Sequence, residues 1–84
     1  MSRKQKLIDR LHLLPKDFTY NEARTLLGLY GFTEDTKGRT SGSRVMFANN
    51  TLDINFRLHK PHPSNILKGY QIKELLELIK KLEG

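Results

Sequence analysis

The sequence predicts one small α+β domain in which helices lie before and after a three-stranded antiparallel sheet. Three observations lead to this fold class. The chain has only 84 residues, its apolar residues recur at helical spacing near both ends, and they alternate with a period of two in the middle. A chain of this length builds a single core and has little room for a deep pocket. We therefore expect residues 1–84 to form one domain with its functional groups near the surface.

The first expected helix begins near Ser2. Ser2 and Gln5 have the spacing of a capping box. Pro15 should end this helix, because proline lacks the N–H donor that a helix interior needs. We treat residues 1–17 as an N-terminal helical extension and residues 18–84 as the core of the domain. The apolar face of the extension consists of Leu7, Leu11 and Leu14.

The second expected helix covers residues 20–30. Thr19 and Glu22 form a second capping-box pattern at its start, and Gly31 stands where a helix C-terminal glycine belongs. Its apolar positions follow the i, i+3, i+4, i+7 spacing of one helix face: Ala23, Leu26, Leu27 and Tyr30.

From Phe32 onwards the period of two predicts strands over residues 32–36, 43–48 and 51–58. The Asn49-Asn50 pair predicts a two-residue hairpin turn between the last two strands. This turn would set Ala48 opposite Thr51, Phe47 opposite Leu52, Met46 opposite Asp53, Val45 opposite Ile54 and Arg44 opposite Asn55.

The expected register separates an apolar face of the hairpin from a polar face. The apolar face contains Val45, Phe47, Leu52, Ile54, Phe56 and Leu58. The polar face contains Arg44, Met46, Asp53, Asn55 and Arg57. Because the helices must cover the single apolar face, we expect the polar face to stay open or to meet a partner.

The segment His59-Lys60-Pro61-His62-Pro63 is expected to be a rigid, exposed connector, because its two prolines cannot donate to a central strand. A final amphipathic helix follows over residues 70–82, with apolar positions Ile72, Leu75, Leu76, Ile79 and Leu82. We expect the aromatic side chains to pack in or beside the core: Phe32, Phe47, Phe56, Tyr20, Tyr30 and Tyr70.

Positive charge is concentrated in the middle of this chain, whose formal net charge is +6. Residues 36–68 hold six basic side chains against one acidic residue, Asp53. Such a stretch suits an anionic partner, most often nucleic acid, because each neutralised phosphate releases counterions. The alternative is that these charges only keep a small protein in solution.

Several function classes are excluded by what the sequence lacks. Without cysteine there is no disulfide framework, thiolate-zinc site or cysteine nucleophile. No apolar run is long enough for a secretory signal or a transmembrane helix. No phosphate-loop, serine-hydrolase or zinc-protease pattern occurs. We expect a cytoplasmic protein that has no membrane association and no metal or small-molecule cofactor.

The histidines are the side chains best suited to proton transfer near neutral pH. His12 lies in the first helix, where a structural role is expected. His59 and His62 flank Lys60 beside the basic sheet face, so either imidazole could activate a ribose 2′-hydroxyl, or both could simply be hydrogen-bonded in a turn. A metal at His59 and His62 would need a further ligand and is disfavoured.

The basic residues Arg44, Arg57 and Lys60 suit phosphate binding, because a guanidinium fork matches phosphate oxygens. An ordinary solvated sheet face is the alternative. Ser43 has no base placed beside it by the sequence, and a serine at a strand end usually makes a turn hydrogen bond.

Three stretches, taken in order, resemble the HicA toxin family across roughly residues 18–84. They are Gly42-Ser43-Arg44-Val45-Met46-Phe47, then Leu58-His59-Lys60-Pro61-His62-Pro63, then Leu67-Lys68 with Tyr70-Gln71-Ile72-Lys73. The resemblance implies a fold similar to double-stranded RNA-binding domains. It also implies a toxin of a type II toxin-antitoxin system, a ribosome-independent endoribonuclease that acts on mRNA and is masked by a HicB antitoxin.

The family pattern at the second strand is Gly-Ser-His, with a catalytic histidine, whereas this chain has Arg44 at that position. A guanidinium stays protonated at physiological pH and cannot act as a general base. We therefore expect Arg44 to stabilise the scissile phosphate and His62 or His59 to transfer the proton. His62 is preferred, because prolines hold it on both sides. The expected substrate-binding residues are Ser43, Arg44, Arg57, Lys60 and Lys68.

Two other functions stay open. The same fold without catalysis would be an RNA-binding or protein-interaction module, which the arginine at position 44 favours. A DNA-binding repressor is disfavoured, because no helix-turn-helix spacing is evident.

Overall fold

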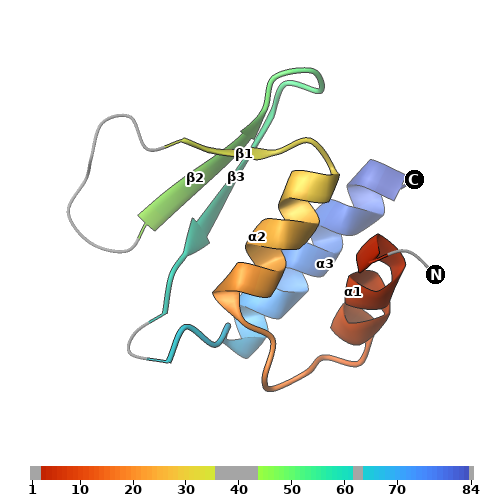
Figure 1. Ribbon diagram of the computed structural model, residues 1–84, viewed down its shortest axis with the longest axis vertical. Coiled ribbons are helices and arrows are strands. Elements are labelled where there is room, and N and C mark those ends of the chain that lie inside the picture. Colours follow the sequence, from red (N-terminus) through yellow and green to blue (C-terminus); the bar gives the residue numbers. More distant parts are fainter. Residues whose placement is uncertain (1–2, 36–43, 62–63, 84) are drawn as a thin grey trace.

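The computed structural model describes residues 3–35, 44–61 and 64–83. Six elements follow one another along them: α1 (Arg3–His12), α2 (Tyr20–Leu29), β1 (Thr33–Asp35), β2 (Arg44–Asn49), β3 (Ile54–His59) and α3 (Gly69–Glu83). The strands form one antiparallel sheet in the order β1-β2-β3. Figure 1 shows the strands on one side of the molecule and the helices on the other, with α1 farthest from the sheet. The predicted α+β class is therefore confirmed.

The start and end of α2 follow the sequence signals closely. Thr19 and Glu22 make the predicted capping box. After the helix, Gly31 has a φ of +90°, and the N–H of Phe32 donates to the carbonyl of Leu27 at 3.0 Å. This Schellman arrangement satisfies the last carbonyls of the helix and sends the chain into β1. A Cβ at Gly31 would lie 3.1 Å from Nδ2 of Asn49, so glycine also allows a close approach to β2.

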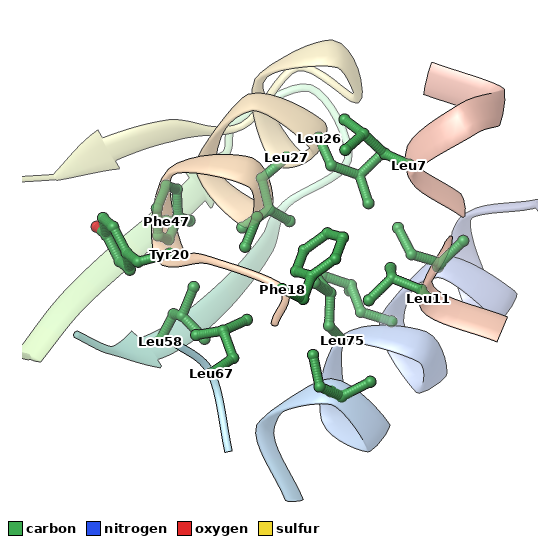
Figure 2. Packing of buried hydrophobic residues seen from close by; sticks show 14 of the residues in the cluster. Leu7, Leu11, Phe18, Tyr20, Leu26, Leu27, Phe47, Leu58, Leu67 and Leu75 are labelled. Atoms are coloured by element: carbon green, nitrogen blue, oxygen red, sulfur yellow. The ribbon is translucent and has the colours of Figure 1, made fainter. Parts of the chain in front are cut away.

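The core is continuous from α1 to the sheet, and Phe18 lies near its centre (Figure 2). Residues from all three helices pack around it, including Leu11, Leu26 and Leu75, and Phe47 and Leu58 contribute from the sheet. The buried residues of α1, which are Leu7, Ile8 and Leu11, belong to this same core. The N-terminal extension is thus an integral part of the packing.

Two expected core positions are wrong. Leu14 is 51% exposed and has a φ of +50°. It lies beyond the end of α1, where the N–H groups of Leu13 and Leu14 bond back to the carbonyls of Arg10 and Leu11. Tyr70 is 58% exposed, because the first turn of α3 turns its neighbours Gln71 and Ile72 to the interior instead.

The predicted register of the β2–β3 hairpin is wrong. Phe47 was expected opposite Leu52 but pairs with Phe56, a shift of four residues along the partner strand. Residues 50–53 form the turn, so Leu52 is exposed outside the sheet, and Asp53 takes a φ of +56°. Because four is an even number, the side chains that stay in the strands keep their predicted faces.

The side chain of Asn49 explains the longer turn. Its Nδ2 donates to the carbonyl of Tyr30 at 2.8 Å, and its Oδ1 accepts from the N–H of Leu52 at 3.0 Å. Asn49 is buried as the last residue of β2. A local turn preference is therefore overruled by a tertiary contact with the end of α2.

Candidate nucleic-acid interface

The outer face of the sheet is the face that points away from the helices. Its described side chains alternate with the buried residues of β2 and β3: Met46, Ala48, Asn55, Arg57 and His59. Arg57 and His59 are exposed, whereas Leu58 between them is buried. No described helix lies over this face in Figure 1. The surface that was expected to stay open is open among the described residues.

The sheet register brings two predicted site positions together. Arg44 is the partner of His59, and Met46 is the partner of Arg57. His59 was expected in a connector, but it is the last residue of β3, because the longer turn moves the pairing of this strand towards its C-terminus. Ser43 and His62 lie outside the described residues, and Arg44 is described by its backbone pairing.

Lys60 lies apart from the outer face. Lys60 directly follows the last residue of β3, and strand alternation puts it on the side of Leu58 and not of His59. Its Nζ lies 5.5 Å from the centroid of the Tyr20 ring. That ring is buried and packs against Phe47, at a centroid distance of 6.2 Å, on the helix-covered side. The structure therefore groups Arg57 with His59 and places Lys60 at the edge towards α2.

Tyr20 is held in its neutral form by the same surroundings. Burial is the main cause that raises the pKa of Tyr20, and the hydrogen bond from its hydroxyl to the Glu34 carboxylate, at 2.6 Å, raises it further. Arg24, whose Nε lies 3.0 Å from Oε1 of Glu34, partly opposes this shift. Tyr20 therefore locks α2 to β1 and is not a proton donor near neutral pH.

Lys68 is exposed directly before α3, and one buried amide ties its backbone to β3. The N–H of Lys68 donates to Oε1 of Gln71 at 2.9 Å, and Nε2 of Gln71 donates to the carbonyl of His59 at 2.7 Å. Sequence reasoning missed Gln71. The available signal was a polar residue on the apolar helix face that also carries Ile72, Leu75 and Leu78.

Two hollows in the described surface lie on the helix side. One of about 320 Å³ lies between α1 and α2, and one of about 370 Å³ lies between α2 and β1. Neither is lined by Arg57, His59 or Lys68.

Within residues 3–35, 44–61 and 64–83, no three His, Asp or Glu side chains gather closely enough to hold a metal ion. Among the same residues, no helix has both the length and the apolar character needed to cross a bilayer. Comparisons of the chain with models of protein families, with curated proteins and with solved structures find no match.

Proposed function

We propose that this chain is a HicA-like toxin that binds RNA on the outer face of its sheet and cleaves mRNA. The observation that carries the proposal is the open outer face, on which exposed Arg57 and His59 lie in one strand and Arg44 is the register partner of His59. The order α2-β1-β2-β3-α3, with helices on one side of the sheet, fits the double-stranded RNA-binding layout that the family resemblance implies.

Arg57 is the best phosphate ligand on this face. Among the described side chains, the cations that form ion pairs are Lys4, Arg10 and Arg24. Arg57 forms no ion pair with a described carboxylate. A guanidinium that is exposed and not engaged in this way can meet two phosphate oxygens with parallel N–H donors. The contact is electrostatic and independent of sequence, so RNA affinity should fall as salt rises.

In the proposed cleavage, an imidazole removes the proton of a ribose 2′-hydroxyl. The 2′-oxygen then attacks the adjacent phosphorus, and the bond from phosphorus to the 5′-oxygen of the next nucleotide breaks. That oxygen takes a proton from an imidazolium or from water. His59 is one candidate base, because it lies on the outer face, and His62 is the other. Arg44 is proposed to stabilise the negative charge on the phosphate.

The test is to induce the chain alone in a bacterial host and to measure growth and mRNA length. Growth arrest with shortened mRNA, lost in His59→Ala or His62→Ala, is the expected result. His12→Ala is the matched control, since His12 is exposed on α1, away from the sheet. Full activity in both His59→Ala and His62→Ala would contradict the histidine mechanism.

A second candidate function is RNA binding without cleavage, which the arginine at position 44 favours. It predicts growth arrest with intact mRNA and salt-dependent RNA binding by the purified protein. In either case the proposed partner that masks the outer face is a HicB-like antitoxin. If the intact chain causes no growth arrest and does not bind RNA, both functions are contradicted.

A further inference from the structure

We propose that Gln71 is a positioning residue, which holds the His59 end of β3 and the Lys68 start of α3 in the arrangement that binds RNA. The inference rests on the proposed function and deepens it, because it joins Lys68, on another element, to the RNA-binding surface. Gln71 itself would not touch RNA, since it is only 2% exposed.

The amide of Gln71 serves two backbone groups of opposite kind. Its Nε2 donates to the carbonyl of His59 at 2.7 Å, and its Oε1 accepts from the N–H of Lys68 at 2.9 Å. The amide offers an N–H donor and a carbonyl acceptor on two separate atoms of one side chain, and asparagine would be shorter by one methylene. A carboxylate would keep the acceptor and lose the donor.

The Gln71 amide joins the end of β3 to the residue before α3, and this position matters for RNA binding. Among the strands that the structure describes, β3 is an edge strand that pairs with β2. Gln71 attaches the last residue of β3 to the next element of the chain. On the other side, the N–H of Leu67 donates to the carbonyl of Phe18 at 2.8 Å, which fixes the approach to Lys68. The same buried amide therefore holds the backbone of His59 and the backbone of Lys68, two residues whose side chains are exposed.

A polyanion that contacts both side chains needs their spacing to be fixed before binding. If the two hydrogen bonds of Gln71 are lost, the two side chains must be ordered separately when RNA binds. The entropy cost of this ordering lowers the affinity for RNA. We expect Gln71→Met, which fills the same space without hydrogen-bonding groups, to weaken RNA binding by about threefold to tenfold. Gln71→Glu should weaken it as well, since its carboxylate would face the His59 carbonyl.

The measurement is the affinity of the full chain for a short single-stranded RNA, at a temperature where every variant is folded. Lys68→Ala is combined with Gln71→Met in a double-mutant cycle. If Gln71 acts by placing Lys68, removal of the Lys68 side chain weakens binding less in Gln71→Met than in the wild-type chain. A purely structural role would leave the two losses multiplicative.

Ile79→Val is the control for a general loss of stability, because Ile79 is a core residue in the second half of α3. Unchanged affinity in Gln71→Met, or an equal loss in Ile79→Val, would overturn the positioning role while leaving the proposed function in place. Failure of the wild-type chain to bind RNA would overturn both. The amide hydrogen of Lys68 should also exchange faster in Gln71→Met and keep its protection in Gln71→Glu.

Discussion

The two faces of the β2–β3 hairpin differ sharply, although they are built from alternate residues of the same strands. On the inner face Phe47 and Leu58 are each 1% exposed and pack against the helices. On the outer face Arg57 and His59, each one position from Leu58, are exposed. The inner face supplies the burial that stabilises the domain, and the outer face presents exposed polar side chains. Changes on the two faces should therefore affect different measurements.

The largest expected effect is that of Phe47→Ala on the inner face. Removal of a fully buried phenylalanine should lower the free energy of unfolding by about 3–5 kcal/mol, measured by urea denaturation. The fraction that stays folded should bind RNA as the wild-type chain does. A loss below about 1 kcal/mol would mean that the helices do not seal this face.

Asn49→Ala should lower the free energy of unfolding by about 1–3 kcal/mol, because the carbonyl of Tyr30 and the N–H of Leu52 would lose their partner. Asn50→Ala, at an exposed neighbouring turn position, is the control. Equal stabilities of the two variants would show that the polar end of the inner face contributes nothing to the fold.

Alkaline pH should weaken the inner face through Tyr20. Its pKa is raised in the folded state, chiefly by burial, so its contribution to stability is complete below the unfolded pKa of about 10. That contribution is lost as pH rises from there through the folded pKa. Urea midpoints measured from neutral to strongly alkaline pH should fall less in Tyr20→Phe than in the wild-type chain. Identical profiles would contradict this linkage, although Tyr30, whose pKa is also raised, titrates in both proteins.

The smallest expected effect on stability is that of Arg57→Ala on the outer face, within about 0.5 kcal/mol. RNA affinity should fall for every RNA sequence, and the dependence of log affinity on log salt should become shallower by about one. Lys73→Ala removes the same charge from an exposed position of α3 and should leave that slope unchanged. An unaltered slope in Arg57→Ala would remove the outer face as the binding surface.

Local signals in the sequence were sufficient for the elements but not for their pairing. The capping box at Thr19 and Glu22 and the glycine at position 31 placed α2, because capping depends on neighbours in the chain. The hairpin register failed because Asn49 bonds to Tyr30, 19 residues away. Leu14 was misplaced, because α1 ends at His12, two residues earlier than Pro15 alone requires.

The candidate site was predicted in part for a related reason. Strand alternation placed Arg57 on the polar face, but the position of His59 opposite Arg44 depended on the register and was missed. Lys60 was grouped with Arg57 by charge, and only the structure shows its ammonium group over the Tyr20 ring. Gln71 could be noticed in the sequence as a polar residue on an apolar helix face. No sequence pattern, however, predicts its two backbone partners.

The contact between Asn49 and the end of α2 also bears on the order of folding. The carbonyl of Tyr30 is in place only after α2 has formed and closed on Gly31. In a chain where α2 is still unformed, the hydrogen bond from Asn49 to Tyr30 is missing, and the shorter Asn49-Asn50 turn competes. We expect the native hairpin to be selected late, when the helix already lies against it, and mis-paired hairpins to appear as a slow refolding phase that grows when α2 is weakened.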